Sequence, residues 1–392
     1  MSKIFKNEII PYARQIIGRN DIAKVIQTLK SDFLTQGPEI EKFEKKICNY
    51  TGAKYSVAVN SATSGLHLAC LALELKPGDC LWTSPNSFVA SSNCGLYCGA
   101  KIDFVDIDEN SFNICPNKLE QKLKNTLSKN RPRILVVVHF GGNPCELEQI
   151  KKLSRIYSFF IIEDASHAIG SKYKSTKIGD CKFSDLVVFS FHPVKIITTG
   201  EGGMILTNKK KYCKKLKLLR NHGIFKDIQK FHKKKNFSWF YNQTILGLNY
   251  RMSDIEAALG SSQMTNINKW VDKRNIIARN YIKHLKNLPI IFQKVNSCNL
   301  SSYHLFVIKI DSKIKKFNRN KLYLKLKSQG INANVHYIPI YRHAYYQKLG
   351  FEKNHYKTCE NYFKNCLTLP IFPTLKNKDI NKIIKNVRSF FI

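Results

Sequence analysis

Four polar segments of this sequence directly follow apolar stretches, and each carries side chains that could do chemistry. In the first, SFHPVKIITTGEGG (residues 190–203), Lys195 lies between an apolar stretch and two isoleucines followed by threonines and glycines. Burial lowers the pKa of a lysine, so that its neutral amine can act as a nucleophile and a base. A surface lysine with its amine in water is the alternative, but Pro193 and the Thr-Thr-Gly run indicate a constrained turn.

The second segment, IIEDASHAIGS (residues 161–171), ends an apolar stretch with two acids. Glu163 and Asp164 are adjacent, and His167 follows three residues after the second acid. Side chains alternate along a strand, so only one of the two acids needs to point into a site. Buried carboxylates are rare unless a donor or a cation lies beside them. By itself the segment fits equally well a helix-capping aspartate and a buried histidine with satisfied hydrogen bonds.

The third segment, NSATSG (residues 60–65), stands between a predicted strand and a predicted helix. Its small residues would let backbone N–H groups at the helix N-terminus converge on an anion, with Thr63 or Ser64 adding a hydroxyl. It is not a P-loop, because no GxxxxGK pattern is present. For this segment alone, an ordinary Ser/Thr helix cap is the commoner explanation.

The fourth segment, SPNSFVAS (residues 84–91), completes the requirements of one cofactor. Phe88 begins a predicted helix there; most such aromatic residues belong to the core, but some stack on a flat ring. Pyridoxal phosphate needs a lysine for its imine, a carboxylate at its pyridine nitrogen, a phosphate site and a flat neighbour. The four segments supply one of each: Lys195, Asp164, the 60–65 turn with Ser190, and Phe88. We therefore predict a pyridoxal-phosphate enzyme.

The elements that must position these residues alternate between helical and strand patterns. Helical patterns occupy 21–30, 39–50, 63–75 and 88–99, and strand patterns occupy 55–60, 80–84, 101–108, 133–140, 159–165 and 186–192. Several of these strands are apolar enough to be buried on both faces, which is typical of a mostly parallel α/β sheet covered by helices. Ligand sites in such sheets gather at the carboxyl ends of the strands.

The pattern changes after about residue 255. A helical stretch at 255–288 leads to an apolar strand at 302–310, a helix at 318–330 and a strand-like segment, INANVHYIPI, at 331–340. We predict a large α/β domain over residues 1–255, including the N-terminal segment, and a smaller α+β domain over 256–392.

Composition excludes several other classes of protein. Of the 392 residues 43% are hydrophobic, and no apolar run approaches the roughly 18 residues of a membrane-spanning helix. The N-terminus lacks the apolar core of a signal peptide, so we expect a cytoplasmic protein without a membrane partner. The 12 cysteines form no CxxC pair, so we expect free thiols and no metal site.

The formal charge of +36 raises the possibility of nucleic-acid binding. The charge is dispersed lysine, however, and runs such as 208–217 and 231–237 resemble solvated helix and loop faces. A basic nucleic-acid-binding protein would also leave Lys195 and Asp164 unexplained. We therefore expect no nucleic-acid partner, although so positive a field favours an anionic substrate.

With these residues in view, the chain resembles the DegT-type (DegT/DnrJ/StrS) sugar aminotransferases over nearly its whole length. The segments that carry the resemblance are LTQGPEIEKFE, VAVNSATSGLHLA, FVDID, IEDASHAIGS, FSFHPVKIITTGEGGMILTN, LRNHGI, LGLNYRMSDIEAALG and HYIPIYRHAYY. The resemblance implies a fold-type I pyridoxal-phosphate transferase, similar to aspartate aminotransferase, that acts on nucleotide-linked keto sugars. Some family members are dehydratases with histidine in place of the lysine, and Lys195 argues against that activity.

Within the family, SDFLTQGP, WTSPNSFVASSNCGLYCGA and VVHFGGNPCE are most similar to the branch that serves pseudaminic acid biosynthesis and flagellin glycosylation. That similarity implies L-glutamate as amino donor. It implies as acceptor a UDP-linked 2-acetamido-2,6-dideoxy-4-keto hexose of the L-arabino configuration, which becomes a 4-amino sugar. A D-configured 4-keto or a 3-keto nucleotide sugar stays open, because no residue identifies the sugar.

The resemblance also implies roles for individual residues. Lys195 forms the imine and carries the proton between the substrate carbon and the cofactor, Asp164 pairs with the pyridine nitrogen, and Phe88 stacks on the ring. The other implied cofactor contacts are His167 near the ring hydroxyl, and Ala62, Thr63 and Ser190 at the phosphate.

Three further implications concern a second subunit and the substrate. Asn249 matches an asparagine that reaches the cofactor phosphate of the neighbouring subunit, which implies a homodimer with shared active sites. Arg251, His336 and Tyr337 are candidates for substrate contacts.

Overall fold

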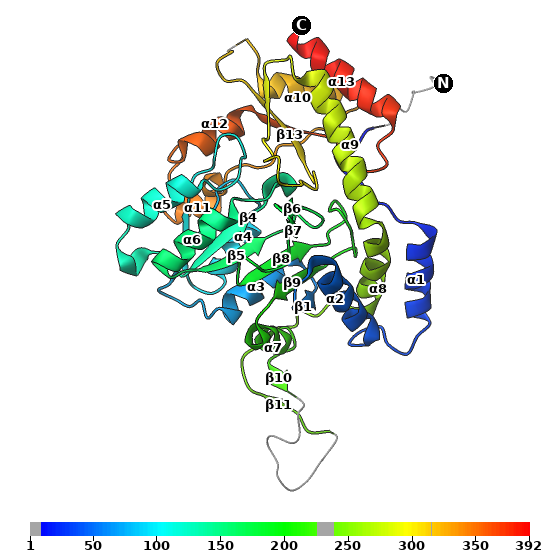
Figure 1. Ribbon diagram of the computed structural model, residues 1–392, viewed down its shortest axis with the longest axis vertical. Helices are drawn as coiled ribbons and strands as arrows, with labels where there is room; N and C mark the ends of the chain where they lie inside the picture. The colour runs from blue at the N-terminus through cyan, green and yellow to red at the C-terminus, as the bar shows by residue number, and fades with distance from the viewer. Residues whose placement is uncertain (1–8, 226–238, 315) are drawn as a thin grey trace.

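A seven-stranded sheet organises most of the chain in the computed structural model, which describes residues 9–225, 239–314 and 316–392 (Figure 1). In spatial order its strands are β1 (Tyr55–Val59), β9 (Gly203–Thr207), β8 (Leu186–Ser190), β5 (Phe160–Asp164), β4 (Ile134–Val138), β2 (Cys80–Thr83) and β3 (Lys101–Phe104). The strands from β8 to β3 run parallel, whereas β9 is antiparallel to both β8 and β1. The predicted mostly parallel α/β sheet is confirmed.

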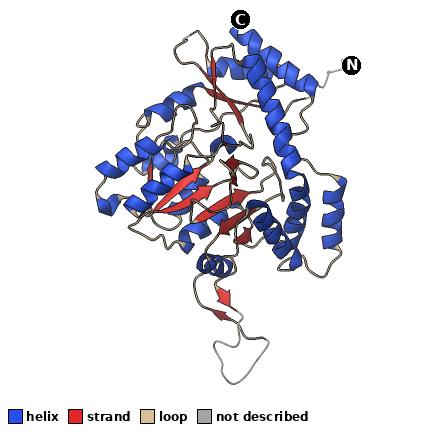
Figure 2. Cartoon of the chain, viewed as in Figure 1, coloured by secondary structure: helices blue, strands red, loops and turns tan. Residues whose placement is uncertain are grey.

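Helices cover both faces of this sheet (Figure 2), and alternate residues of each strand enter two different cores. Leu135 and Val137 of β4 pack in one core, and Ile134 and Val136 pack in the other. The first core is covered mainly by α2 (Pro38–Thr51), α5 (Pro116–Asn125) and α6 (Leu147–Tyr157), and the second by α3 (Ala62–Ala72), α4 (Ala90–Leu96) and α7 (Lys210–Leu219). Burial on both faces explains why the strands are nearly continuous apolar runs.

Two consecutive helices, α8 (Asp254–Gln263) and α9 (Ile267–Leu285), connect the seven-stranded sheet to the C-terminal part of the chain. Ser253 begins α8 with a capping box, in which its hydroxyl accepts from the Glu256 N–H and the Glu256 side chain accepts from the Ser253 N–H. After α8, α9 runs toward the C-terminal end of the molecule (Figure 1). The helix α1 (Arg19–Leu29) packs beside α8, at the right of Figure 1.

A second, antiparallel sheet forms beyond α9. Its strands are β12 (Ile290–Phe292), β13 (Phe306–Ile310) and β14 (Cys366–Leu369), and it packs in a third core with α10 (Arg319–Ser328) and α13 (Asn377–Phe391). The division of the chain into two domains at residue 255 stays a prediction. The shorter elements are β6 (Lys172–Tyr173), β7 (Thr176–Lys177), β10 (Ile224–Phe225), β11 (Asn242–Gln243), α11 (Ala344–Lys348) and α12 (Lys357–Asn365).

The predicted strand at 331–340 is wrong. The segment makes only isolated bridges, from Ile331 to Ile10 and from Asn334 to Thr368. Ile331 and Ala333 are buried and Val335 and Tyr337 half-buried, but Pro339 lacks an N–H and no strand in the described part of the chain continues the ladder. The basic run at 231–237 lies outside the described residues.

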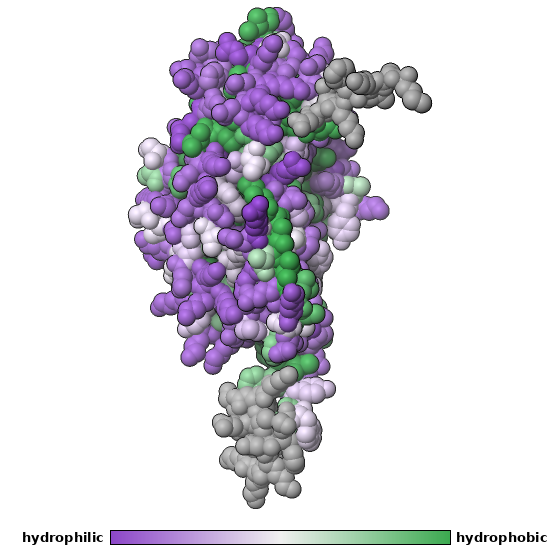
Figure 3. All heavy atoms as spheres, turned by 90° about the vertical axis from the view of Figure 1, so that its right-hand side faces the viewer, coloured by the Kyte–Doolittle hydropathy of each residue, from purple (hydrophilic) through white to green (hydrophobic). Residues whose placement is uncertain are grey.

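One surface of the molecule carries a band of apolar side chains, on the side where α1 lies (Figure 3). Three of the exposed residues, Ile22, Ile26 and Leu29, follow one another at helical spacing along α1. Among the described residues, no helix combines the length and apolarity needed to cross a membrane.

Candidate active site

A cavity of about 330 Å³ lies where β5 and β8 end and α3 begins. It is lined by Tyr12, Ser61, Ala62, Thr63, Leu66, Ser87, Phe88, Ala90, Val138, Asp164, Ser166, His167, Ser190, His192, Val194, Lys195, Glu201, His336 and Tyr337. All the predicted site residues except Asn249 and Arg251 are therefore brought together in one place. The volume suits a small-molecule ligand.

Lys195 lies in a tight turn directly after β8. The turn is closed by hydrogen bonds from the Lys195 N–H to the His192 carbonyl (2.9 Å) and from the Thr199 N–H to the Phe191 carbonyl (3.0 Å). Burial lowers the pKa of the Lys195 amine to about 8, although the negative charge of Asp164 acts in the opposite direction. A substantial fraction of the amine is therefore neutral near pH 8 and can act as a nucleophile.

Asp164 is the last residue of β5, and its carboxylate is held by two serines. Oδ2 accepts from the Ser91 hydroxyl at 2.6 Å, and Oδ1 accepts from the Ser166 hydroxyl at 2.6 Å and the Ser166 N–H at 3.2 Å. A fixed, 5% exposed carboxylate of this kind can pair with a cationic group in the cavity.

The N-terminus of α3 forms a cradle for an anion. Ser61 is the N-cap, and its hydroxyl accepts from the Ser64 N–H at 3.1 Å. Ala62 and Thr63 line the cavity, and their N–H groups, which precede the first intrahelical hydrogen bond of α3, are available to an anion. A Cβ on Gly203 would lie 2.7 Å from the Ala62 nitrogen, so glycine is needed for β9 to pass this close to the helix start.

His167 faces the cavity as a hydrogen-bond donor. Its Nδ1 accepts from the Gly141 N–H at 3.2 Å, which leaves the proton on Nε2, 3.2 Å from the Tyr337 hydroxyl. Burial, together with the charge of Lys195, holds the pKa of His167 well below its ordinary value, so the ring is neutral. The ring of His304 packs against it, with the two centroids 4.4 Å apart.

The two aromatic sides of the cavity differ in exposure. Phe88 precedes α4 and is 58% exposed, with its ring 6.4 Å from that of Tyr337. His336 is buried, its Nδ1 lies 2.8 Å from the Thr368 hydroxyl, and burial lowers its pKa to about 3. Both residues line the cavity.

Asn249 and Arg251 do not line the cavity of their own chain. Asn249 forms a backbone bridge with Asn221, and the Arg251 guanidinium donates to the Asn221 side chain at 2.6 Å. The prediction that Asn249 acts across a subunit interface stays a prediction.

Four important neighbours were missed in the sequence. Ser91 stands within the fourth polar segment and Ser166 within the second, so their serine type and position were available signals. Tyr12 and His304 are remote along the chain from every polar segment, and no local pattern indicates them.

The residues present fit pyridoxal phosphate. The nucleophilic amine of Lys195, the fixed carboxylate of Asp164 and the anion cradle at Ala62 and Thr63 surround one cavity, as the cofactor's aldehyde, ring nitrogen and phosphate require. Among the described residues no group of His, Cys, Asp or Glu is arranged to hold a metal ion, and the cysteines, all 12 described, are free thiols.

Comparison with known proteins decides the family, because residues 15–388 match the DegT/DnrJ/EryC1/StrS aminotransferase family. The chain belongs to this family. It is a pyridoxal-phosphate-dependent sugar aminotransferase, so the predicted enzyme class and cofactor are confirmed.

Two relatives and two solved structures illustrate the similarity. The chain is 38% identical to a Campylobacter jejuni UDP-4-amino-4,6-dideoxy-N-acetyl-beta-L-altrosamine transaminase (96% of each chain). It is 35% identical to the spore coat polysaccharide biosynthesis protein SpsC of Bacillus subtilis (98% of this chain, 97% of the relative). Helicobacter pylori PseC, an aminotransferase involved in the biosynthesis of pseudoaminic acid, superposes with a TM-score of 0.88 at 31% identity (98% and 99%). The PLP form of Spr1654 of Streptococcus pneumoniae gives 0.88 at 26% identity (97% and 98%).

Proposed function

We propose that the protein transfers an amino group from L-glutamate to C4 of a UDP-linked 2-acetamido-2,6-dideoxy-4-keto hexose of the L-arabino configuration. The product is UDP-4-amino-4,6-dideoxy-N-acetyl-beta-L-altrosamine, a step of pseudaminic acid biosynthesis, which we assign to the cytoplasm. Full-length similarity to the Campylobacter transaminase and to PseC supports this sugar. The observation that carries the chemistry is the convergence of Lys195 and Asp164 in one cavity.

Pyridoxal phosphate supplies an aldehyde that takes up the amino group and a ring that stabilises negative charge on the neighbouring carbon. Lys195 Nζ would hold the aldehyde and would afterwards move the proton at the substrate carbon. Asp164, fixed by Ser91 and Ser166, keeps the ring nitrogen protonated. The lowered pKa of Lys195, about 8, gives it a larger neutral fraction for both tasks than an ordinary lysine has.

The other predicted residues would bind and orient the cofactor and the substrates. The N–H groups of Ala62 and Thr63, with the Ser190 hydroxyl, hold the phosphate at the start of α3. His167, whose Nδ1 accepts from the Gly141 N–H, would donate from Nε2 to the cofactor's ring oxygen, and Phe88 would cover the ring. His336 and Tyr337, which line the cavity, are the candidates for contacts with the sugar nucleotide or the amino donor. Arg251 is a third candidate, but it lies outside the cavity of its own chain.

We further propose a homodimer in which Asn249 completes the partner's phosphate site. Asn249 lies outside its own cavity, on a segment bridged to Asn221 beside the β10–β11 hairpin, which extends away from the sheet (Figure 1). The apolar band on α1 is a surface of the kind that subunit contacts bury.

Sedimentation of the purified protein tests the dimer. Mixing Lys195→Ala with Asn249→Ala subunits tests the shared site, because each heterodimer regains one complete site.

The central experiment measures the absorbance of the loaded protein and its reaction products. We expect a yellow band that shifts with L-glutamate, and borohydride should fix the cofactor on Lys195. Lys195→Ala should lose turnover, whereas Lys124→Ala, on the exposed face of α5, should keep it. Turnover by Lys195→Ala would contradict the assigned chemistry.

A second candidate keeps this chemistry and changes the sugar to a D-configured 4-keto or a 3-keto nucleotide sugar. The observation that supports this candidate is the 35% identity to SpsC, whose name refers to spore coat polysaccharide rather than to an altrosamine sugar. Product analysis with L-arabino and D-configured UDP-keto sugars separates the two. Conversion of the L-arabino sugar supports the first, and conversion of only a D-configured sugar supports the second.

A further inference from the structure

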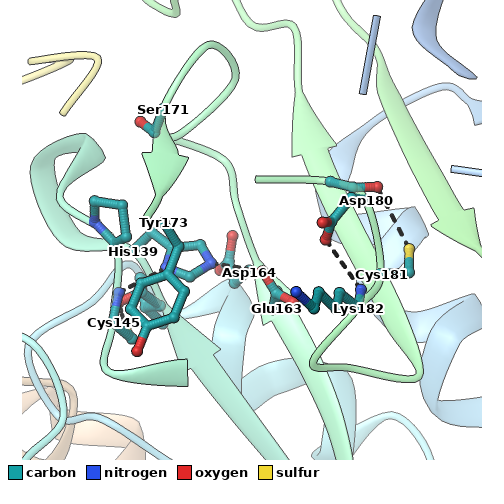
Figure 4. A network of polar contacts seen from close by, with 12 residues as sticks. His139, Cys145, Glu163, Asp164, Ser171, Tyr173, Asp180, Cys181 and Lys182 are labelled. Atoms are coloured by element: carbon teal, nitrogen blue, oxygen red, sulfur yellow. Dashed lines mark hydrogen bonds and ion pairs between the residues drawn. The ribbon is translucent and has the colours of Figure 1, made fainter. Parts of the chain in front are cut away.

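A buried acid–base pair lies beneath the candidate active site, on the opposite face of β5. Glu163 and His139 are 2% and 0% exposed, and Glu163 Oε2 lies 2.8 Å from His139 Nε2. Figure 4 shows this pair with Cys145 beside the histidine and Asp164 next to the glutamate. Neither side chain lines the cavity, so neither can touch a ligand bound there.

A backbone hydrogen bond determines which ring nitrogen of His139 carries the proton. His139 Nδ1 accepts from the Cys145 N–H at 3.0 Å, so the ring proton of a neutral His139 lies on Nε2. That proton is donated to Glu163. The carboxylate therefore anchors the imidazole in one tautomer and one orientation, and burying a carboxylate here would be costly without such a donor.

The anchored histidine begins the turn that reaches the active site. The His139 carbonyl accepts from the Gly142 N–H (3.1 Å), and between them the Gly141 N–H donates to His167 Nδ1 (3.2 Å). Gly141 has a φ of +68°, and a Cβ there would lie 3.0 Å from the Gln293 side chain. The turn is thus a tight, specific structure, and its amide decides which nitrogen of His167 faces the cavity with a proton.

We propose that the His139–Glu163 pair is a positioning device for His167. It holds the 139–142 turn so that the Gly141 N–H occupies His167 Nδ1 and leaves Nε2–H as the donor into the cavity. This inference rests on the role proposed above for His167. Without the pair, the turn relaxes and both tautomers of His167 become populated, so that the cavity loses a fixed donor.

The test is nitrogen NMR of the pyridoxal-phosphate-loaded protein, with ¹⁵N in the rings of its 11 histidines. His167→Asn identifies the signals of His167. In the unsubstituted protein we expect an unprotonated Nδ1 and a protonated Nε2. A protonated Nδ1 in that spectrum would overturn the proposal without the need for any variant of Glu163.

Two variants of Glu163 separate positioning from simple stability. Glu163→Leu removes the acceptor, and we expect averaged His167 signals and cofactor binding weaker by about tenfold, the effect of losing one hydrogen bond. Glu163→Gln keeps an acceptor oxygen for His139 Nε2–H, and we expect it to retain the His167 tautomer. An averaged tautomer in Glu163→Gln, or an unchanged one in a folded Glu163→Leu, would contradict the proposal.

Asp185→Asn is the matched control. Asp185 is also a buried acid of this sheet region, where it accepts from the Ile161 N–H at 3.1 Å and from Lys209 at 2.7 Å, far along the strands from His167. We expect this variant to melt at a lower temperature while His167 keeps its signals. Because the tautomer is read without turnover, it can be established even if the proposed sugar or amino donor is wrong.

Discussion

Glu163 and Asp164 are consecutive in the sequence, yet their carboxylates bind partners on opposite faces of β5. Asp164 Oδ2 accepts from Ser91 in the cavity, and Glu163 Oε2 lies against His139 beneath the sheet. Strand geometry requires this separation, because successive side chains point to opposite faces. One acid is thereby available to a ligand, and the other is available to the scaffold that supports the site.

The first testable consequence is the pH dependence of cofactor capture. The pKa of Lys195 is lowered from 10.5 to about 8, so the amine is protonated and unreactive below that pH and neutral above it. We expect the rate at which the apo-protein captures pyridoxal phosphate to rise with pH, with a midpoint near 8. Stopped-flow absorbance between about pH 6 and pH 10 measures it.

Substitutions of two acids that line the cavity, Asp164 and Glu201, test the cause of this pH dependence. The negative charge of Asp164 raises the Lys195 pKa, so Asp164→Asn should move the midpoint to lower pH. Glu201 also lines the cavity but is not among the groups that shift Lys195, and Glu201→Gln should leave the midpoint in place. A midpoint near 10.5 in the unsubstituted protein would contradict a buried lysine.

The second consequence concerns two adjacent serines of α4. Ser91 donates to Asp164, whereas Ser92 donates to the Val89 carbonyl at 3.0 Å and contacts the Tyr346 hydroxyl. Ser91→Ala should weaken cofactor binding by about tenfold, because a hydrogen bond to a charged group is lost. Ser92→Ala should stay within about twofold. Equilibrium titration with the cofactor measures both, and equal losses would show that Ser91 has no special role.

The third consequence follows from the close approach of β9 to α3. A Cβ at Gly203 would lie 2.7 Å from the backbone at Ser61 and Ala62, so Gly203→Ala must displace the start of α3. We expect loss of phosphate-dependent affinity: pyridoxal phosphate should bind more weakly, and the advantage over pyridoxal should shrink. At Gly18, a Cβ would meet only the Asp21 side chain, at 3.8 Å, so Gly18→Ala should preserve that advantage.

The fourth consequence concerns the packing of Gly65 of α3 against Val188 of β8. A Cβ at Gly65 would lie 2.9 Å from Val188 Cγ1, so Gly65→Ala should overpack this core by about 1–3 kcal/mol and lower the melting temperature. A Val188→Ala background removes this closest contact and leaves Ile205 Cγ1, at 3.3 Å, as the nearest atom, and alanine is the better helix former. There, Gly65→Ala should raise the melting temperature. A drop of equal size in both backgrounds would mean that Val188 does not restrict this position.

Much of the site could be predicted because its residues lie at strand ends. Apolar strands followed by Lys195, by Asp164 and by the 60–65 turn predict one edge of a parallel sheet, and residues at that edge meet in space. The observed sheet order places β5 beside β8 in this way. The incorrect strand at 331–340 shows the limit, since alternating burial does not require a partner strand.

The sequence by itself determined the fold class and the cofactor, and it predicted candidate residues for the site, because apolar periodicity and residue type are local properties of the chain. Tertiary structure alone decided which acid faces the cavity, that Ser91 and Ser166 hold it, and that Gly141 sets the tautomer of His167. These are contacts between residues distant in sequence or on different faces of a strand. Their distances and directions exist only once the sheet and its covering helices have packed.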